Sequence, residues 1–146
     1  TLHTNDSVSA VTRLVDMGVE PFLLASSLIG VGAQRLVRRL CTECRKPFIA
    51  KAAQLKALGF APTKGTFYSA RGCSACNHTG YRGRTGIYEL LTIDDALRRL
   101  IHDRAFEQVL REHAVAHGMR SLRDDGMRWA AQGAISLEEV VRVTRE

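Results

Sequence analysis

Apolar residues recur at the spacing of an α-helix near the start of the chain. The pattern predicts a helix that Asp6 or Ser7 caps and that Gly18 ends. Its apolar face would be formed by Val8, Val11, Leu14 and Val15. Pro21 suits the first turn of a second helix, and the dense apolar residues from Phe22 to Ile29 predict that this helix is almost completely buried.

The last third of the chain carries apolar residues at helical spacing in four stretches. Thr92 can cap the first helix, a second follows Asp103, and a third covers about residues 121–132. Ser136 and Glu139 have the spacing of a capping box, which predicts the start of a fourth helix. A helical subdomain is therefore expected at this end of the sequence.

Four shorter stretches complete the pattern. Gly86–Leu91 is rich in β-prone residues and predicts a strand, and Thr1–His3 resembles the end of another strand. Ala50–Leu58 predicts a short helix, and the segment Ala33–Leu40 is also expected to be helical. The sequence therefore predicts an α/β chain that is mostly helical.

The composition is that of an ordinary globular protein. The 146 residues are 45% hydrophobic and 25% charged, which argues against a wholly disordered chain. No apolar run reaches the roughly 18–20 residues that a membrane-spanning helix needs. Because the chain begins at Thr1 and not at Met, we expect it to be a piece of a longer protein.

The four cysteines form two Cys-x-x-Cys pairs, Cys41 with Cys44 and Cys73 with Cys76. In each pair both thiolates can reach one ion at the Zn–S distance of about 2.3 Å. Such pairs usually bind metal in cytosolic proteins, whereas disulfides suit small secreted domains. We therefore predict a structural four-cysteine zinc site, with disulfides or free thiols as the alternative. His78 is the nearest spare ligand, and we expect it on the surface of the site.

The net charge of +6 is concentrated in the middle of the chain. Residues 51–91 hold six Lys or Arg against one Glu, a net of +5. A basic segment of this kind could attract nucleic acid or acidic lipid. Four thiolates with one Zn²⁺ would add a charge of about −2 nearby. Part of the basic excess would then balance the thiolates, which weakens the case for nucleic-acid binding.

The sequence contains no complete catalytic motif. A phosphate-binding loop requires GxxxxGK[ST], and the nearest stretch, Gly59–Gly65, has its Lys and Gly in the wrong order. The acidic pairs Asp94–Asp95 and Asp124–Asp125 fall near the first turns of predicted helices, where the helix dipole stabilises them. Ordinary surface or core positions are expected for three histidines of the last third, His102, His113 and His117.

Three arginines precede the first cysteine pair. At helical spacing, Arg35 shares a face with Arg38 and Arg39. This face could be a solvated surface beside the thiolates, or an interface with another subunit, since the planar guanidinium pairs bidentately with carboxylates. Nucleic acid is a third possible partner.

His3 is the remaining candidate functional residue. It lies at a predicted strand end, just before a predicted helix start. The carboxyl ends of strands in α/β sheets commonly face ligands, so His3 could contact one.

Longer motifs around these candidates resemble one family. Before the first cysteine pair they are Thr1–Asn5, Thr12–Phe22 and Ala33–Arg38, and after the second pair comes Gly80–Leu91. Asp124–Gly126 and Ser136–Val140 fit the same pattern. These stretches are similar to the C-terminal part of the secretion traffic ATPases, above all to protein E of type II secretion, with the type IV pilus assembly ATPases second.

The resemblance implies a hexameric RecA-like P-loop ATPase at the cytoplasmic face of the inner membrane. Such enzymes use ATP and Mg²⁺ to drive pseudopilus assembly and protein secretion across the bacterial outer membrane. The implied partners are other copies of the chain and the inner-membrane platform proteins, and not nucleic acid.

The resemblance also assigns residues. His3 corresponds to the His-box histidine beside the γ-phosphate, and Cys41, Cys44, Cys73 and Cys76 correspond to the family's zinc-binding insertion. The family's Walker motifs lie upstream of the His box. We therefore expect this chain alone to lack ATPase activity.

The expected organisation has three parts. Residues 1–40 would be the end of the RecA-like core, residues 41–84 the four-cysteine zinc module, and residues 85–146 a return strand and a C-terminal helical bundle. The alternative is a non-enzymatic zinc-ribbon module that binds nucleic acid or protein. In that case Phe67 and Tyr68, the adjacent aromatic pair in the ribbon, would be the base-stacking platform.

Overall fold

The chain divides into two compact units in the computed structural model, which describes residues 2–61, 63 and 65–144. Unit 1 comprises Thr1–Gln34 and Tyr88–Leu122, and unit 2 comprises Arg35–Ile87 and Arg123–Glu146. Each unit thus combines two stretches that are far apart in the sequence. The predicted division at residues 40 and 84 follows chain order and remains a prediction.

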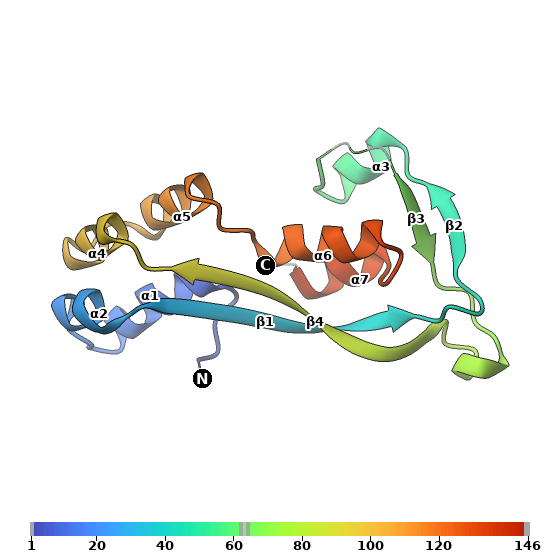
Figure 1. Ribbon diagram of the computed structural model, residues 1–146, viewed down its shortest axis with the longest axis horizontal. Coiled ribbons are helices and arrows are strands. Elements are labelled where there is room, and N and C mark those ends of the chain that lie inside the picture. The colour runs from blue at the N-terminus through green and yellow to red at the C-terminus, as the bar shows by residue number, and fades with distance from the viewer. Residues whose placement is uncertain (1, 62, 64, 145–146) are drawn as a thin grey trace. The chain divides into compact units, whose positions relative to one another are not determined.

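Two long strands, β1 (Gly30–Leu40) and β4 (Tyr81–Thr92), run side by side and contribute residues to both units (Figure 1). The strand predicted over residues 86–91 is confirmed as part of β4. The helix predicted for Ala33–Leu40 is wrong, because these residues belong to β1.

The burial pattern of β1 explains the error. From Gly30 to Val37 exposed positions alternate with more buried ones, which is the period of a strand. The arginine spacing fits a helix, but pairing with β4 decides the conformation. Since successive residues of a strand face opposite sides, Arg35 and Arg38, which are three residues apart, do not share a face as the predicted helix would have them do.

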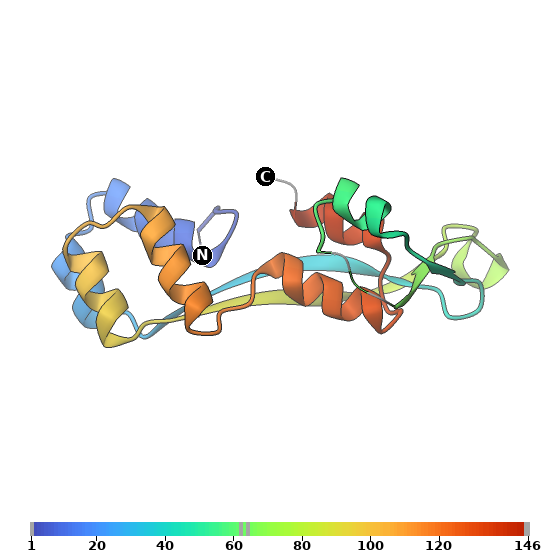
Figure 2. The same cartoon turned by 90° about the horizontal axis from the view of Figure 1, so that it is seen from above.

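Unit 1 is built around four helices. They are α1 (Ser7–Asp16), α2 (Pro21–Ser27), α4 (Asp95–His102) and α5 (Glu107–Ala116). The predicted cap Asp6 is confirmed, since its carboxylate accepts from the backbone N of Ser9 at 2.8 Å. Asp94, and not Thr92, caps α4 by accepting from the backbone N of Leu97 at 2.7 Å. Figure 2 shows α1 lying beside α5, with which it is in contact.

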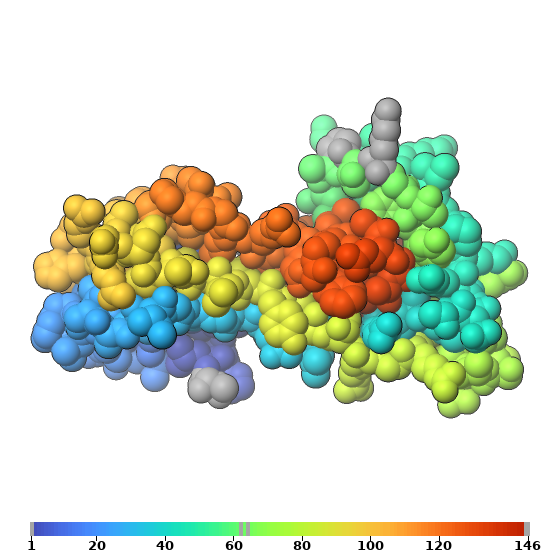
Figure 3. All heavy atoms as spheres, viewed as in Figure 1, coloured from blue at the N-terminus to red at the C-terminus, as the bar shows by residue number. Residues whose placement is uncertain are grey.

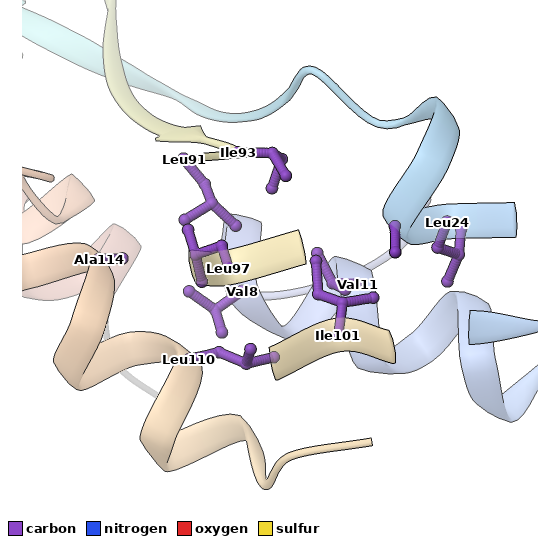
Figure 4. Close-up of a cluster of buried hydrophobic side chains, with 10 residues drawn as sticks. Val8, Val11, Leu24, Leu91, Ile93, Leu97, Ile101, Leu110 and Ala114 are labelled. Carbon is purple, nitrogen blue, oxygen red and sulfur yellow. The ribbon is translucent and has the colours of Figure 1, made fainter. Parts of the chain in front are cut away.

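The core of unit 1 lies between these helices and the end of β4 (Figure 4). Its buried side chains are Val8, Val11, Leu24, Ala25, Leu91, Ile93, Leu97, Ile101, Leu110 and Ala114. Full burial of one large aliphatic side chain contributes roughly 1.5–3 kcal/mol, so this cluster holds the four helices together. Atoms of α2 and α4 meet directly in the space-filling view (Figure 3).

The first residues differ from expectation in two respects. Leu2–Thr4 has no regular secondary structure, so the predicted strand end is not found there, and Thr1 lies outside the described residues. In α2, Phe22 and Leu23 are about half exposed, so the prediction of almost complete burial is wrong. This helix has only seven residues, and one face of its two turns reaches the core.

Glu89 on β4 is a buried carboxylate that the sequence analysis did not single out. It is 3% exposed and accepts from the backbone N of Ser7 at 2.9 Å and from that of Leu122 at 3.2 Å. The hydroxyl of Ser7 donates to the same side chain. Backbone N–H groups at a helix start lack partners within the helix and carry partial positive charge. They can therefore satisfy this carboxylate without a cationic side chain.

Unit 2 combines a small hairpin with short helices. Its further elements are β2 (Lys46–Ile49), α3 (Ala52–Ala57), β3 (Thr66–Ser69), the 3-10 turn η1 (Ser74–Cys76), most of α6 (Leu122–Ala131), and α7 (Leu137–Thr144). β2 and β3 pair antiparallel, with Phe48 opposite Phe67. At Gly126 of α6 a Cβ would lie 2.7 Å from a methyl of Val140 on α7, so glycine is what permits this close approach.

All the helices predicted for the last third are present. α4 and α5 belong to unit 1, whereas α7 and all but the first residue of α6 belong to unit 2. The single C-terminal bundle therefore remains a prediction. No helix in the described part of the chain is long and apolar enough to cross a membrane.

Two arginines converge on one buried carboxylate in unit 2. The side chain of Glu139, on α7, is 1% exposed. Arg38 on β1 donates to it from its backbone N at 2.8 Å and from its guanidinium at 2.9 Å, and Arg142 donates from Nε at 3.0 Å. Burial would raise the pKa of Glu139, but the hydrogen bonds from Arg142 and Arg38 outweigh it and lower the pKa to about 2.

Glu139→Gln is expected to lower the free energy of unfolding by roughly 2–3 kcal/mol at pH 7, because two guanidinium groups lose their ionic partner. Because the pKa of Glu139 is lower in the folded chain than its ordinary value of 4.5, the ionised carboxylate stabilises the fold above pH 4.5. This contribution is lost as the pH falls toward 2 and the carboxylate takes up a proton. The difference between wild type and variant in urea unfolding should therefore shrink from pH 5 to pH 2. Glu138→Gln, at the exposed neighbouring position, is the control. A difference independent of pH would contradict this account.

Candidate metal centre

The four cysteines meet at one end of the β1–β4 sheet. Cys41 follows the last residue of β1, and Cys44 lies in the turn after it. Cys73 directly precedes the short turn η1, and Cys76 is the last residue of that turn, after which the chain leads into β4. The backbone N of Cys41 donates to the carbonyl of Gly80 at 2.9 Å, so the two cysteine pairs are also joined through the backbone.

The spacing of the thiols fits a tetrahedral metal site. All four sulfurs lie within 4.8 Å of one another. Sγ–Sγ distances are 3.9 Å for Cys41 and Cys73, 3.9 Å for Cys44 and Cys76, and 3.8 Å for Cys73 and Cys76. A tetrahedron with Zn–S bonds of about 2.3 Å has edges of about 3.8 Å. All four cysteines are free, and these distances are far longer than a disulfide bond of about 2.05 Å.

Backbone N–H groups point at the sulfurs. Gly80 donates to Cys76 Sγ at 3.1 Å, Cys73 donates to the same sulfur at 3.3 Å, and Gly72 donates to Cys44 Sγ at 3.3 Å. Burial would raise the pKa of Cys76, but these donors outweigh it and lower the pKa to about 6. Burial raises the pKa of Cys73 to about 11, and hydrogen bonding with the neighbouring thiol of Cys76 adds to the rise. The hydrogen bonds thus favour the thiolate of Cys76, and a divalent ion would favour the thiolate form of all four cysteines.

Two glycines beside the second cysteine pair are required by the backbone, and the sequence analysis did not single them out. Gly72 has a φ of +105°, and a Cβ there would lie 2.5 Å from the carbonyl oxygen of His78. Gly80 has a φ of +78°, and a Cβ there would lie 2.7 Å from the Cβ of Ala70. A glycine directly before the second Cys-x-x-Cys pair and another four residues after it were the available signal.

Arg45 links the first cysteine turn to other parts of unit 2. Its guanidinium lies over the ring of Tyr68, 4.5 Å from the ring centre, and donates to the carbonyl of Gly133. Phe67 is buried, with 1% of its surface exposed. The adjacent aromatic pair proposed as a base-stacking platform is therefore part of the packing of unit 2.

The other predicted site residues are not brought to the thiols. His78 is exposed and lies outside the four-cysteine cluster, as expected. His3 is exposed in the segment before α1. Arg38 pairs with Glu139 inside the chain, so its guanidinium already has a carboxylate partner. The roles of His3 and of the arginines Arg35, Arg38 and Arg39 as catalytic and interface residues remain predictions.

Comparison with known proteins places this sequence in a family. The profile of the family "Type II/IV secretion system protein" matches residues 1–142. The chain belongs to this family. The type II secretion system protein HxcR of Pseudomonas aeruginosa is 60% identical over 146 residues, and the type II secretion system ATPase E of Vibrio cholerae is 56% identical over 147 residues. The type IV pilus assembly ATPase PilB of Thermus thermophilus is 44% identical over 149 residues.

These relatives are much longer than the chain. The matches cover 100% of this chain but only 28% of HxcR, 29% of the Vibrio ATPase and 17% of PilB. Among solved structures, the pilus retraction motor PilT with bound ADP superposes with a TM-score of 0.60 at 20% identity, covering 100% of this chain and 32% of PilT. At that identity the likeness shows a shared fold alone.

Gly80→Ala is expected to destabilise unit 2 and to weaken metal retention, because the added methyl would meet Ala70. Gly83→Ala is the matched control, since Gly83 has a similar φ of +75° but nothing within 4 Å of its Cβ position. The control should show only the cost of a left-handed residue, about 1–2 kcal/mol, and Gly80→Ala should lose at least about 1 kcal/mol more. Equal losses in urea unfolding would contradict the requirement for close approach.

Proposed function

We propose that the chain is the C-terminal region of an ATPase that powers type II protein secretion, and that its four cysteines hold a structural Zn²⁺. The observation that carries this proposal is the 56% identity to the type II secretion system ATPase E over the whole chain. The lower identity to PilB, 44%, favours type II secretion over pilus assembly.

The three proposed parts would have separate tasks in this ATPase. Residues 1–40 would end the RecA-like core, residues 41–84 would form the zinc module, and residues 85–146 would return to the core and form the helical subdomain. The phosphate loop, and with it the sites for ATP and Mg²⁺, would lie in the longer protein. His3 would reach the γ-phosphate only in that context.

The four-thiol cluster supports zinc because its chemistry and spacing both fit the ion. Thiolates prefer Zn²⁺ over Mg²⁺ or Ca²⁺, and the Sγ–Sγ distances of 3.8–3.9 Å match a tetrahedral sulfur site. Zn²⁺ bound by four thiolates has no open position, so it would supply a structural crosslink and no reaction.

The assembled motor would be a hexamer at the cytoplasmic face of the inner membrane, in contact with the platform proteins of the secretion system. Arg35 and Arg39 are proposed contacts between subunits. Arg38 is the third proposed contact, although its guanidinium also pairs with Glu139 inside the chain.

The zinc proposal predicts about one tightly bound Zn²⁺ per chain in dialysed, reduced protein. Cys73→Ser should lose most of this zinc and raise hydrogen exchange in residues 41–80, while the helices of unit 1 stay protected, because their core contains no cysteine. Ser74→Ala, an exposed position in the same turn, is the control and should retain the metal. Metal analysis that finds no zinc in freshly prepared wild type would overturn the proposal.

The ATPase proposal predicts no measurable ATP hydrolysis by the 146-residue chain alone, because it lacks a phosphate loop. In the full-length protein, His3→Ala should lower kcat by roughly 100-fold with a smaller change in ATP affinity, as expected for a contact made during transfer. His78→Ala removes another exposed histidine and should leave kcat unchanged. Hydrolysis by the isolated chain, or a full-length His3→Ala enzyme with normal turnover, would contradict the assignment.

A further inference from the structure

A second group of metal-ligating side chains gathers in unit 1. Asp94, His113 and His117 each place one ligand atom within 4.8 Å of the others. Asp94 was expected near the first turn of a helix, and the two histidines at ordinary surface or core positions. The fold brings them together because α4 and α5 pack against each other, with Leu97 and Leu110 both in the core of unit 1.

The two histidines lie one turn apart on and just after α5. Residues four apart share a helix face, and the two rings stack with centres 3.9 Å apart. Nδ1 of His117 lies 2.8 Å from the carbonyl oxygen of His113. Because a carbonyl can only accept, Nδ1 carries the hydrogen, and Nε2 of His117 keeps a free lone pair.

Asp94 supplies an oriented carboxylate. Its Oδ1 caps α4 by accepting from the backbone N of Leu97 at 2.7 Å, and its Oδ2 lies 2.8 Å from Nε2 of His113. The pKa of Asp94 lies below its ordinary value, chiefly through the bond from Leu97 and then through that from His113. One oxygen is thus used for the helix and the other faces the imidazole of His113.

The cluster is open to solvent on one side. The side chain of His113 is 17% exposed and that of Asp94 is 40% exposed, and His117 is exposed. An ion could therefore enter without opening the core. Two imidazoles and one carboxylate suit Zn²⁺ and its neighbours Ni²⁺ and Cu²⁺, whereas Mg²⁺ and Ca²⁺ prefer oxygen ligands alone.

We propose that Asp94, His113 and His117 form a second metal site, which binds a divalent transition-metal ion of the Zn²⁺ class. The ion would take the place of the hydrogen between Asp94 Oδ2 and His113 Nε2, with that imidazole proton moving to Nδ1 of the same ring. Ligand atoms 2.8 Å apart would separate to about 3.3 Å, the edge of a tetrahedron with bonds of about 2.0–2.1 Å. Three protein ligands leave the fourth position to water.

Binding at this site would join the start of α4 to the end of α5. Asp94 precedes the first residue of α4, and His117 follows the last residue of α5. A shared ion would thus clamp the two ends of this helix pair. The site would be weaker than the four-cysteine centre, because it has fewer ligands and keeps contact with water.

The test is a titration of Zn²⁺ into the chain already loaded with one equivalent of Zn²⁺. Calorimetry should detect one further ion with a dissociation constant in the micromolar range. With Co²⁺ as the probe, the second ion should give visible bands without the thiolate-to-cobalt charge transfer of the cysteine site. The two sites can therefore be counted separately.

Two variants and one control assign the ligands. His117→Ala removes a ligand at an exposed position, and Asp94→Asn keeps the helix cap because Asn caps as well as Asp. Each should weaken binding of the second ion by at least about tenfold, and His117→Ala should do so without moving the melting temperature of the metal-free form appreciably. His102→Ala removes another exposed histidine of unit 1 and should bind the second ion like wild type. Uptake of no second ion by wild type, or equal affinity in all three variants, would overturn the proposal.

Discussion

The meeting of four thiols at the end of the β1–β4 sheet is the constraint on which unit 2 depends. β1 ends at Leu40 and β4 begins at Tyr81, so residues 41–80 leave the sheet and return to it at one place. The large apolar side chains that this segment buries are Leu55, Phe60 and Phe67. A segment of about 40 residues with so small a core needs a further link between its ends, and a metal held by four thiolates would supply it.

Charged side chains in both units are used for internal contacts. Glu89 is satisfied by backbone N–H groups and Glu139 by two arginines. Among the described residues of unit 2, four arginine guanidinium groups lie over aromatic rings: Arg38 over Tyr81, Arg45 over Tyr68, Arg123 over Phe60 and Arg128 over Trp129. These contacts account for part of the basic excess, which therefore is weaker evidence for a polyanionic partner than the charge count suggests.

The two candidate metal centres differ in what they can do. Four thiolates close the coordination sphere, so that centre fits a permanent structural ion. Asp94, His113 and His117 offer three harder ligands beside solvent, which fits an ion that exchanges with its surroundings. In this chain, the first would maintain the fold of unit 2, and the second would make the packing of α4 against α5 depend on metal supply.

The sequence by itself determined the features that depend on neighbouring residues. Asp6 caps α1, the short helix near residue 52 forms, and each Cys-x-x-Cys pair places its two thiols together, since each requires only local spacing. The meeting of the two pairs with each other also needs the pairing of β1 with β4. Only the tertiary structure decided the conformation of Arg35–Leu40, because the arginine spacing fits a helix until pairing with β4 selects a strand. The Asp94–His113–His117 cluster likewise arises when α4 packs on α5 and brings residues 19 apart in sequence to 2.8 Å. Contacts of that kind are set by the packing of a shared core, which no local pattern of residues contains.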